Sequence, residues 1–339
     1  MCFDPGMTTQ SESHDQAGTE VTRFIPIPTS VSPEAQQFLS MGLALGRGSG
    51  MQEPERDDDA EGWRAWIKAA NEGLAAAMDM RTGRLPSTVE TISVGDVPVF
   101  VLQPEGVTDD PDQPIYFDIH GGALVMGGGD ACRAMAQQTA AMVRMRTWAV
   151  DYGVPPDHPY PAALDDCIAV YRRLLEVQAP ERIVVGGGSA GGNLAAALML
   201  RARDEGLPLP AALLLLTPEA DLTESGDSFN TNLGIDTVLT SRLTGSIAVY
   251  AGDHDLTHPY LSPLFGDFTP PFPPTFLQTG TRDLFLSNTV RMHRKLRAAG
   301  VDAELHVFEA MPHGGFFGAP EDDELAAEVR RFLASHLEK

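Results

Sequence analysis

The sequence predicts an α/β fold with a mostly parallel β-sheet that is covered by helices on both faces. Short apolar runs alternate with segments of helical periodicity from about residue 115 onward. The run at 211–216 is apolar throughout, as expected of a central strand buried on both sides. The chain has 339 residues, of which 43% are hydrophobic, and this suffices for one large domain of this class with additions.

Two helices are expected before the first strand. The first begins with Ser32 as N-cap and Pro33 at the first helical position, and it runs to about Leu45. The second covers roughly residues 60–80, where apolar side chains that include Trp63 recur at helical spacing. Together they form an N-terminal addition over residues 23–85. Residues 1–22 are polar and are expected to be poorly ordered.

The remaining elements belong to the main domain, residues 86–339. A pair of strands flanks the turn Gly95-Asp96. The interval at about 219–262 is too long for a simple loop, so we expect an excursion beyond the strand ends. Further strands are expected at 115–119, 147–151, 182–186, 211–216, 275–279 and 302–308, and helices at 130–145, 161–177, 190–204, 240–251, 284–299 and 321–337.

Charge and targeting signals exclude several classes of partner. The formal net charge is −23, which disfavours nucleic acids and anionic membrane surfaces because their phosphates would be repelled. No basic segment followed by an apolar core opens the chain, and no apolar run approaches the length of a membrane span. We therefore expect a cytoplasmic protein.

The cysteines and histidines predict neither disulfides nor a metal or other cofactor. Cys2, Cys132 and Cys167 are too few and too widely spaced for a disulfide framework or a zinc motif, and we expect buried or idle thiols. His254 and His258 stand four residues apart beside aspartates, but the sequence offers no third ligand.

A serine among glycines is the first candidate for chemistry. The pentapeptide Gly187-Gly188-Ser189-Ala190-Gly191 lies between a predicted strand and a predicted helix. A nucleophile elbow requires this setting, because its sharp turn tolerates only small neighbours. A plain Gly-rich turn is the alternative. A dinucleotide-binding reading is disfavoured, since no acidic residue follows at the expected distance.

A second glycine-rich loop follows the strand at 115–119. The N–H groups of Gly122 and Ala123 could face an oxyanion, with a further N–H from Ala190 after the serine. His120 opens this loop, and we expect it to hold the loop by hydrogen bonds rather than to transfer protons.

An acid and a base follow downstream in the order Ser, Asp, His. Asp283 stands just beyond a predicted strand, and His313 lies in a Pro/Gly-rich loop after the next strand. Asp283 could instead serve only as a helix N-cap, and His313 could be a loop histidine bonded to backbone. Glu219, Asp221 and Asp236 lie in the excursion. Of these Asp221 is the second choice for the acid, although a turn role suits it better.

Taken together, these motifs resemble the hormone-sensitive-lipase-like (bacterial family IV) esterases of the α/β-hydrolase fold. The matching pieces are His120-Gly121-Gly122-Ala123, "VDYGVPPDHPYPAALDDCIAVYRRL", "GGGSAGGNLA", "YLSPLFGD", "TGTRDLFLSN" and "MPHGGFF", which occur in order over roughly residues 90–335.

The resemblance implies an eight-stranded sheet, a helical cap built partly from the N-terminal helices, and a catalytic triad. By motif, Ser189 would be the nucleophile, His313 the base and Asp283 its orienting acid. Gly121, Gly122, Ala123 and Ala190 would form the oxyanion hole. Homodimers are common among the relatives, so the resemblance also implies a homodimer as one expected state of this chain.

Three positions depart from the family pattern. Ala123 replaces the third glycine of the loop, and its methyl group should narrow the approach to the oxyanion. Gly188 stands where relatives carry Asp or Thr before the serine. The segment that reads "YRLAPE" in relatives is "YGVPPD" here and lacks its arginine.

The expected activity is serine carboxylic-ester hydrolysis of small to medium acyl esters through an acyl-enzyme. A lactone is an alternative substrate, because "DLTESGDSFNTN" and "PHGGFF" resemble relatives that open lactones. A non-catalytic, receptor-like binding protein is an alternative of another class, but the intact Ser189, Asp283 and His313 argue against it.

Overall fold

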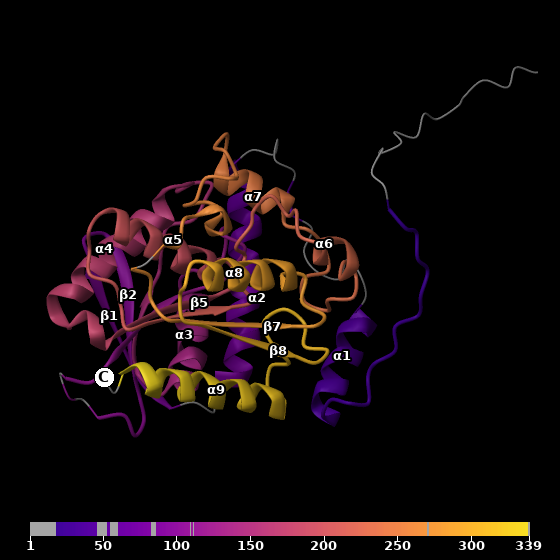
Figure 1. The fold of residues 1–339 in the computed structure, drawn as a ribbon, viewed down its shortest axis with the longest axis horizontal. Helices are drawn as coiled ribbons and strands as arrows, with labels where there is room; N and C mark the ends of the chain where they lie inside the picture. Colours follow the sequence, from indigo (N-terminus) through magenta and orange to yellow (C-terminus); the bar gives the residue numbers. More distant parts are fainter. Residues whose placement is uncertain are drawn as a thin grey trace, which may run out of the picture.

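The structure is a computed structural model that describes residues 18–45, 53–54, 60–82, 86–108, 110, 112–269 and 271–337. The segment 1–22 that was expected to be poorly ordered lies mostly outside the described residues, as does Cys2. Within the described part, residues 18–32 form no helix or strand and lead as an extended arm into the first helix (Figure 1).

One eight-stranded sheet forms the centre of the molecule. Its strand order is β1-β2-β4-β3-β5-β6-β7-β8. β2 pairs antiparallel with both β1 and β4, and every pairing from β4 to β8 is parallel. The strands are β1 (Ser87–Val94), β2 (Val97–Pro104), β3 (Ile115–Ile119), β4 (Arg146–Val150), β5 (Ile183–Gly188), β6 (Ala212–Leu216), β7 (Thr275–Gly280) and β8 (Ala303–Phe308).

Helices cover both faces of this sheet, as predicted. Figure 1 shows α9 on one side of the strands and α8 on the other. The helices are α1 (Pro33–Leu45), α2 (Ala60–Thr82), α3 (Asp130–Val143), α4 (Ala162–Val177), α5 (Ala190–Asp204), α6 (Ser228–Thr231), α7 (Thr244–Ala251), α8 (Leu286–Ala298) and α9 (Pro320–Leu337), with short 3₁₀ turns at Pro180–Arg182 and Pro263–Phe265.

The alternation of strand side chains divides the core into two layers. Phe117 of β3 and Leu213 of β6 point into the layer that α4, α5 and α8 cover. Their neighbours Tyr116 and Leu214 point into the layer that α9 covers. Successive residues of a strand face opposite sides of a sheet, so a strand that is covered twice must be apolar at every position. This is why β5 and β6 are continuous apolar runs and β3 is apolar except for the buried Asp118.

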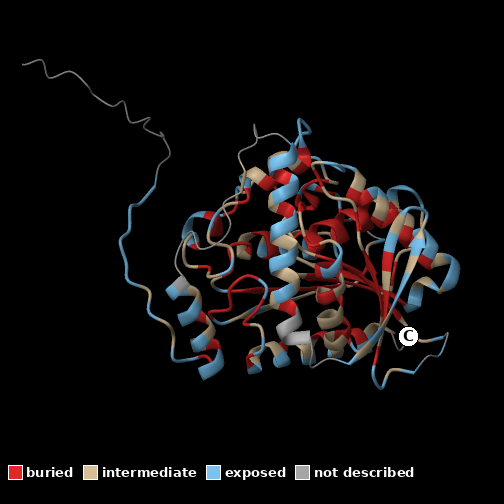
Figure 2. Ribbon diagram, turned by 180° about the vertical axis from the view of Figure 1, so that it is seen from behind, coloured by how far each residue is buried: buried red, intermediate tan, exposed pale blue. Residues whose placement is uncertain are grey.

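The N-terminal helices pack at two separate places. The buried face of α1, with Ala35 and Leu39, packs against the segment that carries Met311 and Phe316. The helix α2 crosses the molecule with one face toward solvent (Figure 2) and buries Trp63 near its N-terminus. Both helices therefore form part of the ordered body around the strand ends.

Most predicted boundaries agree with the structure to within two residues. The helix expected at 240–251 begins only at Thr244, and the short helix α6 was not predicted. Both lie in the excursion, where packing on the main domain rather than hydrophobic periodicity decides which residues form a helix. One turn of helix as short as α6 leaves no periodic signal in a sequence.

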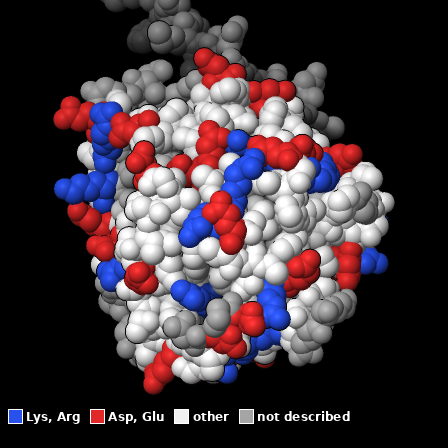
Figure 3. Space-filling model, turned by 90° about the vertical axis from the view of Figure 1, so that its left-hand side faces the viewer, with Lys and Arg blue, Asp and Glu red and all other residues white. Residues whose placement is uncertain are grey.

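The surface carries both signs of charge. The face in Figure 3 shows acidic and basic side chains interspersed over an otherwise uncharged surface. None of the described helices combines the length and the hydropathy that a membrane span requires.

Candidate active site

Ser189 lies at a sharp turn between β5 and α5. Its backbone has φ 58° and ψ −122°, a conformation that residues other than glycine rarely adopt. The turn is fixed from both sides: the N–H of Ser189 donates to Leu216 O at 2.9 Å, and its carbonyl accepts from Asn193 and Glu219. Such strain persists only where the surroundings impose it, and it marks functional sites.

The small neighbours of Ser189 allow this turn to approach β3. A Cβ on Gly191 would lie 1.9 Å from Ile119 O, and one on Gly187 would lie 2.4 Å from the same oxygen. These two glycines are therefore required by close backbone contact. Gly188 differs, because its nearest neighbour to an added Cβ is Leu216 O at an ordinary 3.7 Å.

The structure brings Asp283 and His313 together. Nδ1 of His313 lies 3.0 Å from Oδ1 of Asp283, and both side chains are buried. Oδ2 of Asp283 accepts from the hydroxyl of Thr279 at 2.7 Å, and Oδ1 also accepts from the N–H of Phe285 at 2.8 Å. The N-cap residue of α8 is Phe285, with no side-chain capping bond, so Asp283 is not the helix cap considered from the sequence. Its Oδ1 accepts from Phe285 in the turn before the helix and faces the imidazole.

A second carboxylate, that of Asp236, accepts hydrogen bonds from the backbone of His313 and of Leu284, the neighbour of Asp283. Its Oδ2 accepts from the N–H of Leu284 at 2.8 Å, and both of its oxygens lie 3.3 Å from the N–H of His313. Its Oδ1 further accepts from Val238 at 2.9 Å. The sequence placed Asp236 in the excursion without assigning it a role, because nothing local connects residue 236 with residues 284 and 313.

The two carboxylates set the protonation of the imidazole. Burial lowers the pKa of His313, but the negative charges of Asp283 and Asp236 outweigh burial, so that this pKa is raised above its ordinary value. Burial, followed by repulsion from Asp283, raises the pKa of Asp236 to about 6. An imidazole with its Nδ1–H held by a carboxylate presents the lone pair of Nε2 for proton transfer.

The loop after β3 lies directly against the serine turn. A Cβ on Gly121 would lie 3.4 Å from Cβ of Ser189. Gly122 and Ala123 have φ values of 130° and 52°, which turn the loop sharply. Within the described residues the N–H groups of Gly122, Ala123 and Ala190 donate to no protein acceptor. Free N–H groups at a helix N-terminus and a strained loop can bind an oxyanion.

Side chains on both sides hold this loop in place. Asn71 of α2 accepts from the N–H of Gly127 at 2.6 Å, and Asp151 accepts from the N–H of Gly129 at 2.9 Å. The hydroxyl of Tyr152 donates to His120 O at 2.9 Å. The imidazole of His120 contacts Gly121 O through Nδ1, so His120 supports the loop as expected.

Other sequence candidates have structural partners instead. Asp221 accepts from Thr223 and Ser225 and pairs with Arg291, which makes it a turn residue rather than the acid of the site. His254 and His258 both pack edge-on against the ring of Tyr160.

Comparison with known proteins identifies the family. The α/β-hydrolase fold family matches residues 116–317 of the chain. An esterase of Acinetobacter venetianus is 34% identical over 65% of this chain and 75% of its own length.

Solved structures extend the similarity over nearly the whole chain. The crystal structure of an esterase superposes with a TM-score of 0.86 at 36% identity and covers 94% of this chain and 99% of its own. An esterase from the bacterial hormone-sensitive lipase family superposes with a TM-score of 0.75 at 30% identity and covers 90% and 99% of the two chains. The chain therefore belongs to the hormone-sensitive-lipase-like carboxylesterases of the α/β-hydrolase fold family.

Proposed function

We propose that the chain hydrolyses small to medium carboxylic esters through an acyl-enzyme on Ser189. The observation that carries this proposal is the pairing of a strained serine turn with a buried Asp283–His313 hydrogen bond at the same ends of the parallel strands. The carboxyl ends of parallel strands meet at one edge of the sheet, where active sites of α/β folds lie.

In the acylation step Oγ of Ser189 attacks the ester carbonyl carbon while Nε2 of His313 accepts the hydroxyl proton. The Nδ1–H of the imidazole stays hydrogen-bonded to Asp283, whose negative charge stabilises the imidazolium. The imidazolium then returns its proton to the departing alcohol. A water molecule enters, is deprotonated by the same imidazole, and releases the acid and free Ser189.

The free N–H groups beside the serine stabilise the negative charge that develops on the carbonyl oxygen. Gly121, Gly122 and Ala123 supply this region from one side and Ala190 from the other. Removal of one such donor from a serine hydrolase costs about 10²–10³ in kcat. The methyl group of Ala123 packs toward Trp63 and Ile67 of α2, which links this loop to the cap.

The test is the Ser189→Ala variant on p-nitrophenyl esters of increasing acyl length. We expect kcat to fall by about 10⁴ or more, to the level that the oxyanion donors and binding retain. Wild-type protein should also react with a fluorophosphonate and Ser189→Ala should not. Full activity of Ser189→Ala, or no labelling of the wild type, would refute the mechanism, and the second result would favour a receptor-like protein.

The lactone alternative is tested in the same assay. The same serine, base and oxyanion donors would open a cyclic ester, so the choice rests on substrate shape rather than on catalytic groups. Lactones and matched open-chain esters assayed side by side give the ratio of kcat/KM. A ratio above one would replace the acyl-ester proposal with a lactone hydrolase.

A further inference from the structure

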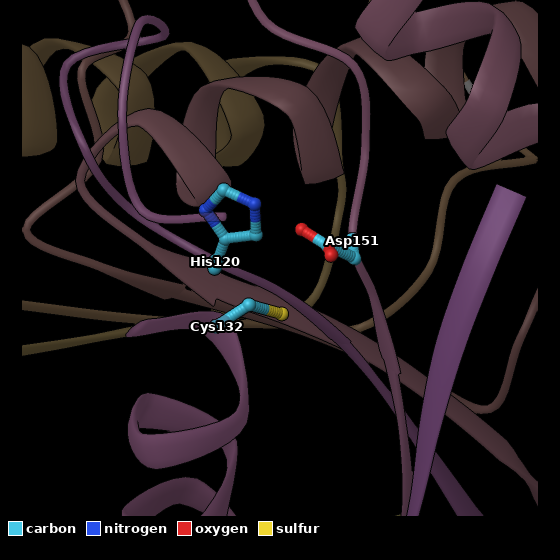
Figure 4. Close-up of side chains that lie close together, drawn as sticks. All are labelled: His120, Cys132 and Asp151. Atoms are coloured by element: carbon cyan, nitrogen blue, oxygen red, sulfur yellow. The ribbon is translucent and has the colours of Figure 1, made fainter. Parts of the chain in front are cut away.

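Three potential metal ligands meet behind the loop that follows β3. His120 comes directly after β3, Cys132 lies in the first turn of α3, and Asp151 comes directly after β4. One ligand atom from each, a ring nitrogen, the thiol sulfur and a carboxylate oxygen, lies within 4.8 Å of the other two. Figure 4 shows the three side chains gathered around one point.

The imidazole of His120 has a buried nitrogen, Nε2, that is available to bind a cation. His120 is only 3% exposed, and its Nε2 has no hydrogen-bond partner among the described residues. Its Nδ1 lies 2.8 Å from Gly121 O, which fixes the proton on Nδ1 and leaves the lone pair on Nε2. Metal-binding histidines carry this arrangement, in which the second nitrogen donates to a backbone carbonyl. A buried acceptor without a partner is otherwise costly.

The surroundings of that lone pair favour positive charge. Cys132 is fully buried, and its thiol contacts Val150 O at 3.6 Å. A carboxylate oxygen of Asp151 lies within 4.8 Å of the Cys132 sulfur. The position therefore combines one neutral imidazole, one thiol and acidic oxygens.

One member of the cluster, Asp151, also lines a cavity. This half-buried carboxylate lines a cavity of about 740 Å³ between α2 and the segments 128–131 and 151–158. Gly128 and Gly129 form the adjacent wall, and an added Cβ on Gly128 would lie 2.9 Å from Oδ1 of Asp151. Asp151 thus belongs both to the cluster and to the wall of this cavity, whereas His120 and Cys132 do not line it.

We propose that His120, Cys132 and Asp151 form a binding site for a divalent transition-metal ion of the zinc class. Zinc accepts nitrogen, thiolate and carboxylate ligands, and tetrahedral coordination places these atoms about 3.5 Å apart. The side chains already lie within 4.8 Å, so small rotations suffice. A water or an anion completes the fourth position. On binding, the thiol gives its proton to solvent and its contact to Val150 O is lost.

A bound ion would tie together the two ends of the loop that carries the free N–H groups. His120 begins this loop and Asp151 accepts from the N–H of Gly129 at its end. The sequence gives no sign of this site, since the ligands are separated by 12 and 19 residues, without any metal-binding spacing.

The experiment uses Co²⁺ as a spectroscopic probe on the full, untagged chain. Cys2→Ser is introduced in all proteins, so that only Cys132 and Cys167 can supply a thiolate. We expect a thiolate-to-cobalt charge-transfer band and intense tetrahedral d–d bands, both removed by one equivalent of Zn²⁺ and unaffected by Mg²⁺. Zn²⁺ at a hundred times its Kd should also raise Tm by a few degrees.

Matched variants locate the ligands. Cys132→Ala should abolish the charge-transfer band, whereas Cys167→Ala removes the other buried thiol and should keep it. Asp151→Asn keeps the thiol and should weaken Co²⁺ binding about tenfold or more. If Cys132→Ala does not fold, Cys132→Ser replaces it. Absence of the band in the starting protein, its persistence without Cys132, or its loss without Cys167 would overturn the proposal.

Discussion

The carboxylate of Asp236 accepts a hydrogen bond from the backbone N–H of His313. Both carboxylate oxygens lie 3.3 Å from the N–H of His313, and one of them also accepts from Leu284, next to Asp283. One buried side chain of the excursion thus connects the two loops that carry Asp283 and His313. Asp236 is a positioning residue in the proposed mechanism, because it acts through these loops.

Replacement of Asp236 by Asn should impair the reaction more than substrate binding. Both carboxylate oxygens of Asp236 accept hydrogen bonds from backbone N–H groups. In asparagine an NH₂ group replaces one of these oxygens, so one buried N–H loses its acceptor at a cost of about 1–3 kcal/mol. We expect kcat to fall about tenfold or more with little change in KM, measured on p-nitrophenyl acetate. Unchanged kcat would show that the loops hold their positions without Asp236.

The same variant should move the pH dependence of the reaction. In the proposed mechanism the neutral imidazole is the base, and the carboxylates raise the pKa of His313, so the acid limb of kcat/KM should lie above pH 6.5 in the wild type. Asp236→Asn removes one negative charge, lowers this pKa and should shift the limb to lower pH. The matched control is Asp221→Asn, which alters a buried, hydrogen-bonded aspartate away from His313. A shift of equal size in the control would contradict the assignment.

Glu219 should make the protein less stable as the pH rises. Its side chain is buried, both oxygens lack hydrogen-bond partners among the described residues, and burial raises its pKa to about 8. The folded state therefore holds this proton more tightly than the unfolded chain. Its stabilising contribution is complete below about pH 4.5, the ordinary value for glutamate, and is lost as the pH rises through about 8.

Glu219→Gln remains neutral at every pH and should remove this loss. Between pH 5 and 8.5 the free energy of unfolding should fall by about 4 kcal/mol less in the variant than in the wild type. Urea unfolding at the two pH values measures it. The control is Glu205→Gln, a surface carboxylate paired with Arg201 and Arg172, which should keep the wild-type fall. Parallel pH dependence of Glu219→Gln and wild type would sink the prediction.

Two glycines beside Ser189 should respond in opposite ways to the same change. Gly191→Ala places a methyl group 1.9 Å from Ile119 O, which forces β3 and the serine turn apart. We expect this variant to be inactive and to lose several kcal/mol of stability. Gly188→Ala meets nothing nearer than 3.7 Å and should leave stability unchanged or slightly raised. Thermal unfolding and esterase assays on the pair decide it. An inactive, unstable Gly188→Ala would show that this position needs glycine.

Most of the fold could be predicted from the sequence because its signals are local. The buried strands β5 and β6 are apolar runs, β3 is one apart from Asp118, and the helices between them have the periodicity of a covered face. Ser189, Asp283 and His313 could be nominated for a related reason. Each is a polar residue just beyond a predicted strand, where the carboxyl ends of parallel strands place it at a common edge.

The tertiary structure alone decided which other polar groups share that edge. Asp236 reaches His313 across 77 residues, and His120, Cys132 and Asp151 converge from two strand ends and a helix. Such contacts depend on how an excursion folds back and on the order of β3 and β4 in the sheet, neither of which leaves a pattern in the chain. The sequence by itself predicted the strands, most of the helices and the three residues proposed for catalysis. Only packing in three dimensions determined what holds them and what lies behind them, because hydrogen bonds between distant segments follow from topology and not from local propensity.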